Sequence, residues 1–160
     1  GRQEEWEVTT PEEVCRRAFR FSRIMAAQYT NHLRFEAADS LPRIQVLRGL
    51  LEQAIVNLIK NSCEALLDGS GRVRLSAAYE DETEEVVISV ADDGGGMEPR
   101  RLSRLGRPFE SGRGEDGGTG LGLSIVHAIL ERHEGRLLVR EDDDYMTVAE
   151  VRLPPLRDSD

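Results

Sequence analysis

Apolar residues recur at helical spacing in three segments of the chain. The first begins at Thr10-Pro11-Glu12-Glu13, where a threonine cap precedes a proline and acidic residues, and its periodicity predicts a helix as far as about residue 28. A second apolar stripe predicts a helix over roughly residues 45–67. The third segment predicts a helix over residues 119–133, which Gly135 ends.

Alternating apolar and polar residues predict strands between these helices. Residues 73–79 and 85–91 alternate on either side of a polar turn and predict an antiparallel hairpin. We expect a further strand over residues 31–37 and a last hairpin from residues 137–140 and 145–153. This order predicts an α/β (α+β) two-layer sandwich, with a mixed, mostly antiparallel sheet of about five strands covered on one face by the three helices.

The composition is typical of one folded domain. With 160 residues, 39% of them hydrophobic, the chain can bury a core, and we expect one domain over residues 5–155 with flexible ends at 1–4 and 156–160. The net charge of −9 disfavours electrostatic capture of nucleic acid or of an anionic membrane. We therefore expect neither as a direct partner of this domain.

The cysteines and the apolar runs indicate a compartment. Cys15 and Cys63 are too few and too far apart for a disulfide framework or a zinc site, and a buried free thiol at Cys63 indicates a reducing, cytoplasmic location. No segment reaches the roughly 18 apolar residues of a membrane span. The start at Gly1-Arg2 is typical of a piece of a longer protein, so the parent can still be membrane-anchored.

Two polar features attract a chemical interpretation. Asn57 and Asn61 lie four residues apart on one face of the predicted second helix, flanked by Lys60 and Glu64. They form either a solvated helix face or a pair of amides directed at a ligand or its metal ion. Asp92 ends a predicted buried strand, and the glycines that follow it make either a capped turn or a close backbone approach to a flat ligand.

A third feature is the glycine-rich segment 117–124 that opens the last helix. Unpaired N–H groups and the positive end of a helix dipole favour phosphates at such a position. The spacing matches neither the P-loop nor the dinucleotide fingerprint, and the segment follows a loop rather than a strand. Taken alone, the segment fits a plain glycine-rich loop better than a phosphate site.

The order of these features resembles a known family. Four segments closely resemble the N, G1, F and G2 boxes of histidine kinases, which belong to the gyrase, chaperone, histidine kinase and mismatch-repair ATPase superfamily: Asn57-Leu-Ile-Lys60-Asn61, Asp92-Asp-Gly-Gly-Gly96, Pro108-Phe109 and Gly118-Thr-Gly120-Leu-Gly122-Leu. The resemblance covers roughly residues 5–155 and implies the Bergerat-type ATP-binding fold.

The resemblance implies ATP and Mg²⁺ as cofactors. It assigns to Asp92 a hydrogen bond from the exocyclic amine of adenine, to Asn61 the magnesium ion, to Asn57 a place beside the phosphates and to Arg113 a place near the γ-phosphate. The candidate catalytic residues are Asn57, Lys60 and Arg113. The candidate cofactor-binding positions are Asn57, Asn61, Asp92, Gly94, Gly96, Met97, Phe109, Gly118, Thr119, Gly120, Leu121, Gly122 and Leu123.

Residues 98–118 resemble the ATP lid of the family, in which Phe109 would pack as the lid closes. Arg113 is either a γ-phosphate ligand or a solvated arginine, and Arg104 and Arg107 are weaker candidates for that role. The chain departs from the family pattern at Asp93, where Asn is usual, and at Glu110, where a second Phe is common. The first departure could weaken nucleotide contacts, and the second leaves the packing of the lid open.

The resemblance implies transfer of the γ-phosphate of Mg-ATP to a histidine on a separate dimerisation and phosphoacceptor domain, with a response regulator as the later partner. None of His32, His127 and His133 is expected to be the acceptor, because Gly135 follows His133-Glu134 at once and no proline follows. The alternatives are an ATP hydrolase of the gyrase or chaperone type and a non-catalytic nucleotide-binding module. Hydrolases of the superfamily, like the anti-sigma serine kinases, carry a glutamate where this chain has Asn57, and an amide cannot act as a general base.

Overall fold

The computed structural model describes residues 5–94 and 120–157, in which a five-stranded sheet carries the fold. The strand order is β2 (Leu33–Ala37), β4 (Val73–Glu80), β5 (Glu85–Asp92), β7 (Thr147–Leu153), β6 (Arg136–Arg140). Only the β2–β4 pair among these neighbours is parallel, so the sheet is mixed and mostly antiparallel, as predicted.

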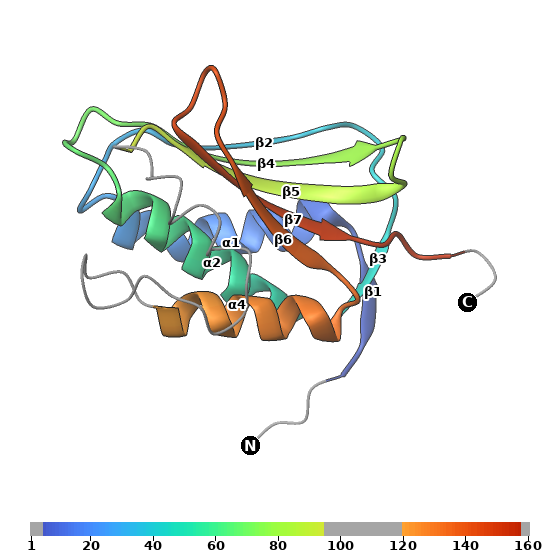
Figure 1. Ribbon diagram of the computed structural model, residues 1–160. Coiled ribbons are helices and arrows are strands. Elements are labelled where there is room, and N and C mark those ends of the chain that lie inside the picture. The colour runs from blue at the N-terminus through green and yellow to red at the C-terminus, as the bar shows by residue number, and fades with distance from the viewer. Residues whose placement is uncertain (1–4, 95–119, 158–160) are drawn as a thin grey trace.

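Three helices in the described part of the chain lie on one face of this sheet (Figure 1): α1 (Pro11–Ala26), α2 (Arg48–Glu64) and α4 (Gly120–Arg132). The predicted cap of α1 is confirmed, since the Thr10 hydroxyl accepts a hydrogen bond from the Glu13 N–H at 3.1 Å. The predicted two-layer sandwich is therefore the observed fold.

The core fills the space between the two layers. Residues at every second position of the central strands face the helices, among them Leu75, Ile88 and Val151, and all three are buried. They pack in one cluster with apolar side chains of α2 such as Ile55 and Ile59. Helix α2 packs against both α1 and α4, so it is the central helix of the layer.

The predicted helix over residues 45–67 is wrong at both ends. Residues Ile44–Val46 form strand β3, which pairs antiparallel with β1 (Glu7–Thr9), a strand that was not predicted. Ile44 and Val46 are buried on either side of an exposed Gln45, so their alternation is that of a strand, but three residues are too short to show it against the following helix. At the other end, Ala65 caps α2 and exposed Leu67 lies beyond it.

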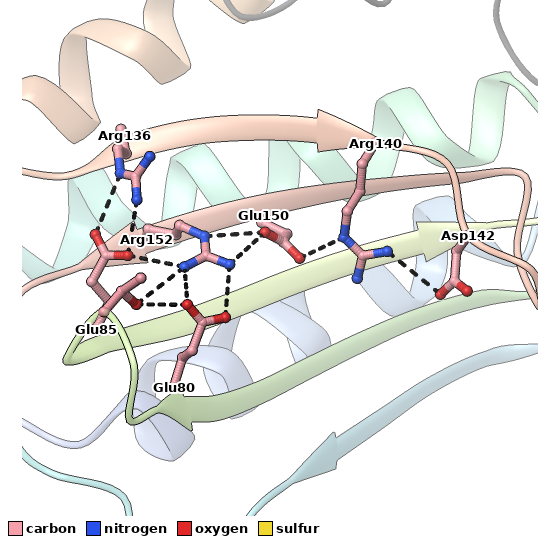
Figure 2. A network of polar contacts seen from close by, with 8 residues as sticks. Glu80, Glu85, Arg136, Arg140, Asp142, Glu150 and Arg152 are labelled. Atoms are coloured by element: carbon pink, nitrogen blue, oxygen red, sulfur yellow. Dashed lines mark hydrogen bonds and ion pairs between the residues drawn. The ribbon is translucent and has the colours of Figure 1, made fainter.

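The opposite face of the sheet carries charge. Figure 2 shows the guanidinium group of Arg152 among three carboxylates, those of Glu80, Glu85 and Glu150, at distances of 2.9–3.1 Å. Three further residues extend this network: Arg136 to Glu85, Arg140 to Glu150, and Arg140 to Asp142. No described helix is both long enough and apolar enough to cross a membrane.

Candidate functional site

Asp92 is a buried carboxylate at the end of strand β5. Its side chain is 3% exposed, because the strand end lies against helix α2. The Gly94 N–H donates to Asp92 Oδ1 at 2.8 Å, and the Ser62 hydroxyl of α2 is near enough to act as a second donor, which lowers the pKa of Asp92. Burial nevertheless raises the pKa of Asp92 above its usual value, because these two donors do not replace the lost water. The carboxyl group is held in place, and its ionised form is less favoured than in water.

Gly94 brings the strand end into direct contact with α2. A Cβ at this position would lie 2.6 Å from the carbonyl oxygen of Ala65 and 2.8 Å from Asp92 Oδ1. Only glycine fits such an approach without displacing the backbone. The sequence predicted Gly94 as a cofactor-binding residue, and in the structure its hydrogen atom leaves room for the last turn of α2.

The two asparagines lie on the helix that Asp92 contacts. Asn57, Asn61 and Ala65 are spaced four residues apart, so they lie along one side of α2. Since Ala65 contacts Gly94, this row begins at the end of β5 and continues along the helix through Asn61 to Asn57. Both asparagines are half-buried. The structure therefore brings Asp92 to the side of α2 that carries the predicted amides.

Helix α4 contributes the other predicted segment. Gly120, Leu121 and Gly122 form its first turn, whose N–H groups have no partner within the helix. Leu123 is half-buried and packs against the main core, so its side chain has a structural place. Figure 1 places the start of α4 toward the same side of the molecule as the ends of α2 and β5.

The other predicted residues are one exposed lysine and positions that the structure does not describe. Lys60 is exposed on α2 and lies 4.0 Å from Glu64, its i+4 neighbour. The remaining predicted positions lie outside the described residues, as does the predicted lid 98–118: Gly96, Met97, Phe109, Arg113, Gly118 and Thr119. The described residues hold no group of three or more His, Cys, Asp or Glu side chains that could bind a metal ion.

Sequence reasoning missed two residues that support Asp92. Ser62 is buried and donates to its carboxylate, and Arg72 holds the neighbouring Asp93 in a two-pronged ion pair, with Nε–Oδ2 at 2.8 Å and Nη2–Oδ1 at 3.0 Å. Ser62 directly follows Asn61, which is a signal that could have drawn attention to it. Nothing in the sequence pairs Arg72 with Asp93, which is 21 residues away.

His133 has a structural place, in accord with its rejection as a phosphoacceptor. The imidazole is buried at the end of α4, where Nε2 accepts the Leu47 N–H at 3.0 Å and Nδ1 lies 2.8 Å from the Ile129 carbonyl oxygen. The Trp6 ring packs edge-on against it, with centroids 5.2 Å apart. Burial lowers the pKa of His133, so the neutral ring is favoured.

Comparison with known proteins gives a consistent family. The family model described as "Histidine kinase-, DNA gyrase B-, and HSP90-like ATPase" matches residues 47–157. Histidine protein kinase DivJ of Caulobacter vibrioides is 34% identical over 147 residues, 90% of this chain and 24% of DivJ. Sporulation kinase E of Bacillus subtilis is 34% identical over 122 residues, 76% of this chain and 16% of that kinase. The chain thus spans a quarter or less of these relatives.

Solved structures share the fold. The nucleotide-free catalytic domain of histidine kinase ThkA superposes with a TM-score of 0.76 at 23% identity, covering 94% of this chain and 98% of that one. Full-length ShkA in complex with AMPPNP gives a TM-score of 0.78 at 23% identity, covering 96% of this chain and 32% of ShkA. Because the family model matches more than half of this chain, the chain belongs to the histidine kinase-, DNA gyrase B- and HSP90-like ATPase family.

Proposed function

We propose that this chain is the catalytic domain of a sensor histidine kinase, which binds Mg-ATP and presents the γ-phosphate to a histidine on a separate phosphoacceptor domain. The observation that carries the proposal is the buried carboxylate of Asp92, held against the helix that bears Asn57 and Asn61. The names of the relatives, histidine protein kinase DivJ and sporulation kinase E among them, support the same activity.

Asp92 would accept a hydrogen bond from the exocyclic amine of adenine. A buried carboxylate with two donors and a raised pKa gains from a further N–H donor, and a hydrogen bond to a charged group contributes about 1.5–3 kcal/mol. The bound analogue AMPPNP in the ShkA structure is an adenine nucleotide and supports this ligand class. Gly94 and Gly96 would let the base approach the backbone, with Met97 beside it.

Asn61 would supply an amide oxygen to Mg²⁺. A single amide oxygen from the protein fits this ion, because magnesium in nucleotide sites keeps several waters and takes few protein ligands. When bound, the ion offsets part of the charge of the triphosphate, which matters in a chain of net charge −9. Asn57, Lys60 and Arg113 would lie beside the phosphates, and the N–H groups from Gly118 to Leu123 would face them at the start of α4. Phe109 would pack within the lid.

Asn57 separates a kinase from a hydrolase. Rapid hydrolysis needs a group that takes a proton from the attacking water, and an amide cannot do so. A histidine acceptor brings its own nucleophilic nitrogen, so positioning and charge neutralisation suffice. We further propose a cytoplasmic location for this domain, with a response regulator as the partner that receives the phosphoryl group from the histidine.

Nucleotide affinity tests the site. Calorimetry of the chain with an unhydrolysable ATP analogue should show binding that depends on Mg²⁺, and Asp92→Asn should weaken it by about 10- to 100-fold. Asp143→Asn, an exposed change of the same chemistry, is the matched control and should bind like the wild type. Normal affinity in Asp92→Asn would overturn the assignment of the purine contact.

Phosphoryl transfer tests the reaction. With a histidine-containing acceptor domain added in trans, the chain should form acid-labile phosphohistidine from labelled ATP, while releasing phosphate very slowly alone. Rapid phosphate release without the acceptor would favour the hydrolase alternative. Binding of nucleotide without either activity would favour a regulatory module.

A further inference from the structure

Arg72 connects the end of β5 to the turn before β7. Its guanidinium group holds Asp93 with two hydrogen bonds, donates to the Asp144 carbonyl oxygen at 3.0 Å, and lies 4.4 Å from the centre of the Tyr145 ring. The backbone N–H of Arg72 also donates to Asp93 Oδ2 at 2.9 Å. One side chain thus fixes a carboxylate, a backbone carbonyl and a ring around the same strand end.

The backbone of Asp92 and Asp93 is held at the same place. The Asp93 N–H donates to the Arg72 carbonyl oxygen at 3.1 Å, and the Met146 N–H donates to the Asp92 carbonyl oxygen at 3.0 Å. The backbone of Arg72 thus bonds to Asp93, and the backbone of Met146 bonds to Asp92. This explains how the chain accommodates an aspartate where the resembling family usually has an asparagine, because Arg72 offsets the added charge.

The charge of Asp93 matters because Asp92 is adjacent. A carboxylate beside a buried carboxylate disfavours ionisation of the buried one. The charge of Asp93 raises the pKa of Asp92, although burial raises that pKa more and the hydrogen bonds from Gly94 and Ser62 each have a larger, lowering effect. In turn, the hydrogen bonds from Arg72 lower the pKa of Asp93 and keep it ionised. The guanidinium group is therefore paired with the same carboxylate whose charge acts on Asp92.

We propose that Arg72 is a positioning residue of the nucleotide site. It pairs with Asp93, so that Asp92 stays ionised and correctly oriented to accept a hydrogen bond from the purine amine. The role of Asp92 in this statement rests on the proposed function. Arg72 itself touches neither the base nor the phosphates; it acts through its partner carboxylate.

Helix α2 and strand β7 present uncharged groups to Asp92, so the effect of Asp93 on the pKa of Asp92 can be measured. Helix α2 presents Ser62, which has no charge, and Cys63, whose thiol pKa is raised to about 11 by burial, so it stays neutral at physiological pH. Strand β7 presents Thr147 as the register partner of Asp92. Asp93 is thus the ionised neighbour whose effect on Asp92 depends on Arg72.

The test is a titration of the Asp92 side-chain carboxyl by carbon-13 NMR in the nucleotide-free chain. Arg72→Gln should move its midpoint to higher pH, and Arg72→Gln combined with Asp93→Asn should return the midpoint to the wild-type position or below it. Arg72→Lys, which keeps the charge, should recover most of the wild-type midpoint. Thermal unfolding of each variant checks that it is folded at the pH range used.

Nucleotide affinity gives the second measurement. Arg72→Gln should weaken binding of the ATP analogue by about two- to fivefold at neutral pH, the range of a partly exposed ion pair, and the double variant should recover it. A midpoint that does not move in Arg72→Gln overturns the proposal whatever the affinity. If the midpoint moves as expected but the wild type binds no nucleotide, the proposed function fails and the electrostatic pairing stands.

Discussion

At the scale of single residues, the candidate site depends on how the buried carboxylate of Asp92 is held in place. Asp92 receives hydrogen bonds from Gly94 and Ser62, yet burial dominates and its pKa remains raised. The Ser62 hydroxyl matters because the serine is buried and lies on α2, so it fixes the carboxylate relative to the helix that carries Asn61. Orientation of Asp92 is therefore a property of two elements.

Ser62→Ala tests that link. Removal of one hydrogen bond to a buried carboxylate should weaken analogue binding by about three- to tenfold and lower the melting temperature by a few degrees. Calorimetry of the variant beside Ser89→Ala, a half-buried serine on β5, measures the difference. Equal affinities in the two variants would show that Ser62 does not orient Asp92.

At the scale of elements, the contact between β5 and α2 leaves no space at Gly94. A methyl group there would meet both the Ala65 carbonyl oxygen and Asp92 Oδ1, so Gly94→Ala should destabilise the fold by about 1–3 kcal/mol and reduce nucleotide binding. Gly49→Ala is the matched control, because nothing lies within 4 Å of its added Cβ and alanine favours the helix. Urea unfolding of both variants provides the comparison, and equal midpoints would contradict the tight contact.

His133 joins α4 to the start of α2 and should make this joint sensitive to acid. The folded state lowers its pKa from the ordinary value of 6.5, so the stabilisation is complete above that pH and is lost as the pH falls below it. Protonated Nε2 cannot accept the Leu47 N–H. The melting temperature should therefore fall by several degrees between about pH 7 and pH 5.

His133→Gln should lower stability at pH 7 by about 1–2 kcal/mol and flatten this acid dependence. The same scans on His32→Gln, a change at an exposed histidine, should keep the wild-type slope. A His133→Gln variant that retains the full slope would place the titrating group elsewhere.

Long periodic elements were predictable from the sequence, and short or distant pairings were not. The alternation over β4 and β5 was confirmed, and α1 began at its predicted cap, because local spacing alone determines those features. Strands β1 and β3 have three residues each and depend on each other across the chain. The support of Asp92 by Ser62 and of Asp93 by Arg72 depends on packing and register, which no single segment encodes. The candidate site came from the resemblance, and the structure adds the contacts around Asp92 and Asp93 that the sequence did not predict.

At the scale of the whole molecule, the two faces of the sheet carry different kinds of side chain. One face packs against the helices, while the other holds Arg152 and Glu150, both less than one-tenth exposed, in a network of charges (Figure 2). A buried ion pair stabilises little by itself, but removal of one partner leaves the others uncompensated. The network therefore links β4, β5, β6 and β7 on the face opposite the described helices.

Arg152→Met should lower the melting temperature at neutral pH by several degrees. Hydrogen bonds from Arg152 lower the pKa of Glu80 from 4.5 to about 2, so the wild type keeps this stabilisation above pH 4.5 and loses it as the pH falls toward 2. The variant should show a shallower decline over that range. Arg16→Met, which breaks an exposed pair with Glu12, is the control and should melt close to the wild type.

The contact between Trp6 and His133 makes the chain its own optical reporter. Trp6 is the single tryptophan of the sequence, and its indole lies against the imidazole that closes α4 at the end opposite its glycine-rich start. Any event that shifts α4 along its axis or protonates that imidazole changes the surroundings of the indole. Its emission can therefore follow protonation of His133 and acid unfolding without an added dye.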